Sequence, residues 1–346
     1  MRNTTFITTK NGTHLYMVSE VQKERDQMDV FTYGTSVFLP AKEPMVSENT
    51  RMSYQYTLEK HVYPVIGDCL LIDVTPLMLR SLLTDFQRSG MAHTSTVKLH
   101  AILRGFFDMA YKDGLIPKSP MDIVDRPRAT YKEKCMEDSE KAYTAEELAL
   151  VLQCLEKEPL KWRVYIQLMA DTGCRRGELC GLHWEDIDFE NAVITVRHNL
   201  QYTTAKGIYD SAPKNRHFRR VDIGPDVLSL LQELKAEQDR DIQSDWVFTR
   251  NRSAEPMFPQ TPSRYFKEIA KKYDFKDFRP HKLRHTSASI AITNGADVIS
   301  VSRRLGHTDP SVTLRMYTHA NEDSIRRAGE TVRNALKEAA NSQATV

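Results

Sequence analysis

The sequence predicts a mainly α-helical protein of two domains, with a small antiparallel β-sheet in the second domain. A length of 346 residues is long for one ordinary domain and suits two. Apolar stripes at helical spacing recur in both halves. Two short β-prone runs, 192–196 and 220–223, lie in the second half.

Residues 1–28 are predicted to form an N-terminal β-hairpin extension. Two β-prone runs flank Asn11 and Gly12, which both tolerate the positive φ angles of a type I′ turn. A charged stretch, 20–29, then leads into a helical region.

Residues 29–128 are predicted to form an all-helical domain. Its clearest signal is one apolar stripe at helical spacing, made by Leu99, Ile102, Leu103, Phe106 and Ala110. Thr94 or Ser95 is expected to cap this helix, and Gly114 to end it. Segments 54–62 and 76–86 predict two further helices.

Residues 129–140 have little apolar content and many charges, which predicts an extended linker to a second domain, 141–346. Thr144 and Glu147 have capping-box spacing and start its first helix. The two β-prone runs become strands, with Lys214 at or near the turn between them.

Three helix boundaries are predicted towards the C-terminus. Pro280 opens a helix on which His281 and Arg284, at i and i+3, share a face. Gly306 ends a helix, and Asp309 with Pro310 begins the next one, which carries Tyr317.

Composition limits the class of protein. With 40% hydrophobic and 27% charged residues the chain is globular rather than disordered. Its apolar runs are far shorter than the roughly 20 residues that cross a bilayer, and its N-terminus lacks the apolar core of a signal peptide, so we expect a soluble cytoplasmic protein. Five cysteines without a C-x-x-C pair suggest neither disulfides nor a zinc knuckle.

The formal net charge of +2 is small, but basic residues are concentrated in two runs. One spans 214–220, and the other spans 264–284 around the first histidines of the C-terminal third. Because two such runs flank the same histidines, contact with phosphate groups is favoured over a solvated charged helix.

An ordered residue set suits attack on a phosphodiester. Arg175 and Arg284 can each present two parallel N–H groups to the non-bridging oxygens, and His307 can add a third donor. Tyr317 is the candidate nucleophile, with His281 placed to assist it. Lys214 is the candidate general acid for the departing oxygen.

Structural alternatives exist for several of these residues. Tyr317 is one of 14 tyrosines, most of which pack. His281 and His285 have the spacing of a helical metal pair, but Lys282 stands where H-E-x-x-H has glutamate, so no metal is predicted. Glu178 is either a surface acid or a group that orients Arg175 or His281.

The set resembles the catalytic signature of the tyrosine recombinase, or phage-type integrase, family. T-G-C-R-R-G-E-L carries Arg175 and Glu178, and P-K-N-R-H-F-R-R carries Lys214. H-K-L-R-H matches His281 and Arg284, L-G-H matches His307, and M-Y-T-H matches Tyr317. Residues 54–67 and 113–120 are similar to the family's helical core-binding domain.

This resemblance implies a two-domain clamp on duplex DNA, with a SAM-like core-binding domain at 29–128 and the catalytic domain at 141–346. It implies a site-specific recombinase that cuts and rejoins DNA through a 3′-phosphotyrosine, without a cofactor, as a homo-tetramer on two attachment sites. The hairpin at 1–28 favours an integrase of a mobile element, with 1–28 as a remnant of an arm-binding domain and an excisionase or DNA-bending protein as accessory partner.

Other functions stay open at this point. Within the same family, the chain could resolve chromosome or plasmid dimers. Outside it, a metal-dependent nuclease would need clustered acids near the histidines, which the sequence lacks. A non-catalytic DNA-binding protein is disfavoured because all six catalytic positions are filled.

Overall fold

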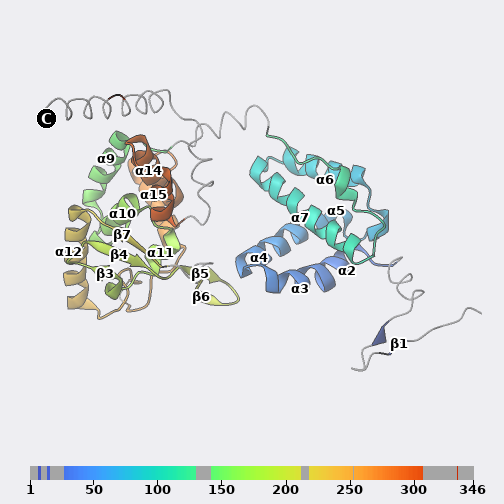
Figure 1. Ribbon diagram of the computed structural model, residues 1–346, viewed down its shortest axis with the longest axis horizontal. Coiled ribbons are helices and arrows are strands. Elements are labelled where there is room, and N and C mark those ends of the chain that lie inside the picture. Colours follow the sequence, from blue (N-terminus) through green and yellow to red (C-terminus); the bar gives the residue numbers. More distant parts are fainter. Residues whose placement is uncertain are drawn as a thin grey trace, which may run out of the picture. The chain divides into compact units, whose positions relative to one another are not determined.

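The computed structural model describes residues 7–8, 14–15, 27–129, 142–211, 218–251, 253–306 and 333. The chain divides into two compact units, Met1–Glu140 and Lys141–Val346, coloured blue to cyan and green to red in Figure 1. Helices dominate both units, and the antiparallel sheets of the second unit are small, which confirms the predicted fold class.

The N-terminal hairpin is present, but its register differs from the prediction. Strands β1 (Ile7–Thr8) and β2 (His14–Leu15) pair antiparallel, with Thr8 opposite His14. A two-residue turn at Asn11 and Gly12 would place Thr8 opposite Leu15 instead. The predicted two-residue turn is therefore wrong, because the observed strand pairing is shifted by one residue. The loop that joins the strands lies outside the described residues.

The first unit is a helical bundle around one apolar core. Two π-helical turns, Gly34–Phe38 and Leu58–Val62, join successive helices without a break. Tyr33, Phe38 and Phe106 are fully buried and stack edge-on or tilted at its centre. The helices are α2 (Val30–Tyr33), α3 (Leu39–Lys42), α4 (Glu48–Thr57), α5 (Tyr63–Ile66), α6 (Pro76–Arg88) and α7 (His93–Lys112).

Helix α7 carries the predicted stripe, and all five of its members are buried. The predicted cap is wrong, because the helix begins at His93 after a non-helical Ala92 and so places Thr94 and Ser95 inside its first turn. Gly114 ends it as predicted, since its φ of 74° is left-handed and suits glycine.

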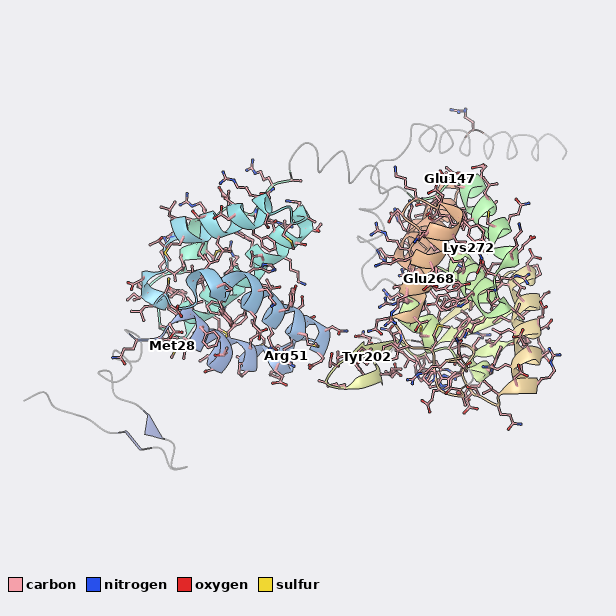
Figure 2. The ribbon with its side chains drawn as sticks, turned by 180° about the vertical axis from the view of Figure 1, so that it is seen from behind. Met28, Arg51, Glu147, Tyr202, Glu268 and Lys272 are labelled. Carbon is pink, nitrogen blue, oxygen red and sulfur yellow. The ribbon has the colours of Figure 1, made fainter. Side chains whose placement is uncertain are left out.

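The first helix of the second unit begins with the predicted capping box. The Thr144 hydroxyl accepts from the Glu147 amide at 3.1 Å, and the Glu147 carboxylate accepts from the Thr144 amide at 2.9 Å. This reciprocal cap starts α9 (Ala145–Cys154). The later helices are α10 (Leu160–Thr172), α11 (Arg176–Cys180), α12 (Pro225–Asp241), α13 (Thr261–Tyr273), α14 (Pro280–Thr293) and α15 (Val298–Leu305). Glu268 and Lys272 mark α13 in Figure 2.

The main sheet has the order β3-β4-β7. Strands β3 (Ile187–Asp188) and β7 (Arg219–Asp222) both pair antiparallel with the central β4 (Val193–Val196). Between β4 and β7 lies a second hairpin that the sequence did not predict, β5 (Leu200–Thr203) with β6 (Gly207–Asp210). Tyr202 labels it in Figure 2. Lys214 follows β6 and lies outside the described residues.

Helix α10 is the centre of the second unit. It packs against α12 and α14, and its Val164, Tyr165, Ile166, Leu168 and Met169 are fully buried. Because these side chains are buried, the last turn of α10 is held in one position. The start of the segment that follows it is therefore fixed as well. Among the described helices of either unit, none is long and apolar enough to span a bilayer.

An added methyl group should change stability in opposite directions at two helical glycines, Gly177 and Gly105. A Cβ on Gly177 in α11 would lie 2.3 Å from Asn199 Oδ1 and 2.5 Å from the Leu200 carbonyl oxygen. A Cβ on Gly105 in α7 would have no atom of the described residues within 4 Å. We expect Gly177→Ala to destabilise the second unit by about 1–3 kcal/mol. Gly105→Ala should stabilise the first by about 0.5–1 kcal/mol.

Urea unfolding measures both effects separately, because Trp162, Trp184 and Trp246 all belong to the second unit. Tryptophan fluorescence should report an earlier transition for Gly177→Ala and an unchanged one for Gly105→Ala, whose effect appears in circular dichroism. A wild-type fluorescence midpoint in Gly177→Ala would refute the close packing of α11 on β5.

Candidate active site

Three arginines from three elements converge on the end of α15. The last carbonyl groups of a helix have no partner within it and form the negative end of its dipole, so they attract cationic donors. The donor–acceptor pairs are Arg219 Nε to Arg304 O at 2.9 Å, Arg284 Nη2 to Leu305 O at 2.7 Å, and Arg175 Nη2 to Gly306 O at 3.0 Å.

Arg284 joins the ends of two helices. Its Nη1 donates to the Gly173 carbonyl at the end of α10, 2.7 Å away, while Nη2 holds the end of α15. Burial and the positive charge of Arg175 lower the pKa of Arg284 to about 10, so it stays protonated at neutral pH. Its two carbonyl bonds use two of the five N–H donors of a guanidinium, and the remaining ones can serve an anion.

Glu178 is the carboxylate at the centre of this arginine cluster. Oε1 accepts from Arg175 Nη1 and Arg219 Nη1, both at 2.9 Å. Oε2 accepts from Arg219 Nη2 at 2.6 Å and from the Arg175 amide at 2.7 Å. Glu178 is buried, and the surface-acid alternative is therefore wrong.

The pKa of Glu178 lies below that of an ordinary glutamate. Burial alone raises the pKa of this carboxyl, but the hydrogen bonds and charge of Arg219 and the charge of Arg175 outweigh burial. The group is ionised at neutral pH.

The cluster carries more positive than negative charge. Arg175, Arg219 and Arg284 supply three positive charges, and Glu178 is the carboxylate that Arg175 and Arg219 share. Guanidinium groups match the oxygens of a phosphate in pairs. The site is therefore suited to a phosphate-like anion at the end of α15.

Two glycines allow the ends of α10 and α15 to make close contacts at this site. Gly173 has a φ of 63°, and a Cβ there would lie 2.5 Å from Leu305 Cδ2. Gly306 has a φ of 70°, and a Cβ there would lie 2.8 Å from Arg219 Nη1. Each glycine in T-G-C-R and L-G-H thus serves both the backbone turn and a close contact.

The structure brings together part of the predicted residue set. Arg175, Glu178 and Arg284 meet in one cluster, and His281 is exposed in the first turn of α14, one turn before Arg284. Lys214, His307 and Tyr317 lie outside the described residues. In sequence, His307 directly follows Gly306, whose carbonyl Arg175 holds.

Arg219 is the member that sequence reasoning missed. It was visible only as part of a basic run, and its pairing with a glutamate 41 positions earlier has no local signature. Its contacts with Glu178 and with the Arg304 carbonyl make it a positioning residue.

Comparison with known proteins places both units in one family. The phage integrase family matches residues 141–324, and the family's N-terminal SAM-like domain matches residues 31–86. The chain is 25% identical over 313 residues to the ICEBs1 integrase of Bacillus subtilis, which covers 87% of this chain and 82% of that one. It is 24% identical over 300 residues to the transposase from transposon Tn916 of Enterococcus faecalis, covering 82% and 73%.

Solved structures share the fold. The Tn1549 transposon integrase in complex with transposon right end DNA superposes with a TM-score of 0.74 at 23% identity, over 88% of this chain and all of that one. A lambda integrase dimer bound to a core site gives 0.64 at 18% identity, over 84% and 95%.

The buried Glu178 predicts a pH dependence of stability. Because the folded-state pKa is lowered, its contribution is fully present above the unfolded-state value of about 4.3 and is lost as the pH falls through the folded-state pKa. Glu178→Gln leaves the arginines without their carboxylate and should cost roughly 3–5 kcal/mol at neutral pH.

Urea unfolding of wild type and Glu178→Gln, followed by tryptophan fluorescence from neutral pH down to acid pH, measures the difference in their free energies of unfolding. The gap between the free energies of unfolding of the two proteins should shrink below a pH of about 4. The exposed Glu233→Gln on α12 is the matched control and should show no gap. A gap independent of pH would mean that Glu178 acts through packing rather than charge.

Proposed function

The chain belongs to the phage integrase family and is a tyrosine-type site-specific DNA recombinase, and from this premise we propose that it integrates and excises a mobile element. Among its relatives are an integrase and a transposase whose names refer to such elements, ICEBs1 and Tn916. The observation that supports the chemistry most strongly is the Arg175–Arg219–Arg284 cluster at the end of α15.

The two motif arginines bind the scissile phosphate in this proposal. Attack on a phosphodiester spreads negative charge over its two non-bridging oxygens, which fixed donors stabilise. Arg175 and Arg284 supply those donors. His307, next to Gly306, adds a third donor from the chain that the arginines hold.

Tyr317 is the nucleophile. Its hydroxyl oxygen forms a bond to phosphorus while the bond from phosphorus to the 5′-oxygen breaks, which leaves a 3′-phosphotyrosine. Lys214 donates a proton to the departing 5′-oxygen, and His281 assists the proton transfers. A 5′-hydroxyl of the partner strand later attacks the phosphotyrosine and releases Tyr317, so the number of phosphodiester bonds is conserved.

Duplex DNA attachment sites are the substrate in this proposal. The similar Tn1549 and lambda integrase structures are complexes with DNA. We propose that the helical unit 29–128 and the catalytic unit 141–346 both bind the DNA. Four protomers act on two sites, and an excisionase or DNA-bending protein controls direction. The reaction takes place in the cytoplasm.

A suicide substrate tests the nucleophile. A DNA site with a nick close to the cleavage position loses its short fragment after attack, which traps the covalent complex. Wild type should give a protein–DNA adduct on a denaturing gel. Tyr317→Phe should give none while keeping its DNA affinity, because only one hydroxyl is removed.

The matched control is Tyr111→Phe, an exposed tyrosine near the end of α7, which should form the adduct as wild type does. An adduct of normal yield with Tyr317→Phe would exclude Tyr317 as the nucleophile.

A sulfur leaving group tests Lys214. A bridging 5′-phosphorothiolate departs without a proton, so an enzyme without its general acid should recover on this substrate. We expect Lys214→Ala to cleave normal DNA at least ~100-fold more slowly, at the lower end of general acid catalysis, and to cleave the sulfur substrate at close to the wild-type rate. Equal losses on both substrates would assign Lys214 to phosphate binding.

A further inference from the structure

A second cluster of ionisable side chains lies beside the main sheet. It contains His183, Asp186 and His198, and one ligand atom from each lies within 4.8 Å of the others. His183 and Asp186 bracket the 3-10 turn Trp184–Asp186, and His198 lies in the connection between β4 and β5. We propose that these three side chains bind one Zn²⁺ ion.

Two buried polar atoms of this cluster have no hydrogen-bond partner among the residues that the structure describes. One is Oδ1 of Asp186, a residue that is 3% exposed; it lies 3.2 Å from Arg197 Nη1 but accepts no hydrogen bond. The other is Nδ1 of His183. His183 Nδ1 is 3.6 Å from Asp186 Oδ2. Buried polar atoms nearly always have a partner, and a bound metal ion would supply one to both atoms.

The third side chain is oriented as a metal ligand usually is. His198 Nδ1 lies 2.6 Å from Asp210 Oδ2, and Asp210 Oδ1 accepts from the Asn199 amide at 2.9 Å. A carboxylate on one ring nitrogen fixes the ring and makes the other nitrogen, Nε2, the ligand. Asp210 thus has the role of the supporting acid in a carboxylate–histidine–metal arrangement.

Two imidazoles and one carboxylate favour zinc over magnesium or calcium, which take oxygen ligands. Zinc prefers four ligands, and the partly exposed His198 leaves room for water as the fourth.

A bound zinc ion would also stabilise the surroundings of the arginine cluster. A Cβ on Gly181 would lie 2.9 Å from His198 Cβ, and one on Gly177 would lie 2.3 Å from Asn199 Oδ1, so this connection packs directly on α11. Helix α11 carries Glu178. Zinc would therefore fasten the β4–β5 connection and the base of the β5–β6 hairpin to the second unit, in a structural role outside the cleavage chemistry.

One contact opposes the proposal. Arg197 Nη1 lies 3.2 Å from Asp186 Oδ1 and 3.6 Å from Glu185 Oε1. In the rival account, Arg197 alone balances the charge of Asp186 and no metal binds. If zinc binds, Arg197 competes with it and can turn towards the exposed Glu185. Removing Arg197 therefore distinguishes a zinc site from a simple ion pair.

The experiment is a zinc titration of the tag-free, metal-stripped full chain against a chromogenic chelator. Wild type should bind one equivalent. Asp210→Asn keeps all three ligands and should weaken binding about 10–100-fold. His198→Gln should weaken it further, and Arg197→Gln should strengthen it. His61→Gln, in the first unit, is the matched control and should bind as wild type does.

Cobalt provides a second readout, because tetrahedral and octahedral Co²⁺ differ in colour. Wild type with Co²⁺ should show the intense absorption of a tetrahedral site, and His198→Gln should not. Circular dichroism of each variant reports folding separately from metal binding. Unchanged zinc binding in both His198→Gln and Asp210→Asn, or no zinc binding by wild type and Arg197→Gln, would overturn the proposal.

Discussion

The second unit depends on the buried ion pair between Glu178 and Arg219. Two parallel hydrogen bonds, of 2.6 and 2.9 Å, join α11 to β7. A buried carboxylate is tolerated only when its charge is compensated, and the same two oxygens also hold the backbone and side chain of Arg175. One acid therefore fixes two arginines from segments more than 40 positions apart. Substitution of Glu178 would leave several cations unpaired at once.

The arginines in turn fix the end of α15. Its last carbonyl groups would otherwise need water, and here each accepts from a charged side chain, which is a stronger bond than one between neutral groups. Arg284 extends the arrangement to the end of α10. Because two negative helix ends face the guanidinium groups, the cluster is tolerated in the protein without DNA and still has an excess of positive charge. That excess is what a phosphate can neutralise.

The sequence predicted those structural features that depend on residues close together in the chain. The α7 stripe, the Thr144–Glu147 capping box and the left-handed Gly306 follow from spacing and backbone preference alone. The structure also brings the motif residues Arg175, Glu178 and Arg284 together, while their catalytic roles stay predictions. The β5–β6 hairpin was missed, although Gly207 with a φ of 67° between two Tyr-containing runs was a usable signal. The role of Arg219 could not be predicted, because it depends on the pairing of β7 with β4 and on the packing of α11 beside them.

A structure of Tyr317→Phe bound to an uncleaved attachment site would show directly whether the arginine cluster binds the scissile phosphate. Guanidinium nitrogens of Arg175 and Arg284 should lie about 2.7–3.2 Å from the two non-bridging oxygens of one phosphate. Glu178 should keep both arginine partners, and the end of α15 should stay bonded to Arg284. A scissile phosphate bound elsewhere, with both arginines still engaged only by carbonyl groups and Glu178, would exclude phosphate binding by these arginines and leave the cluster with a structural role.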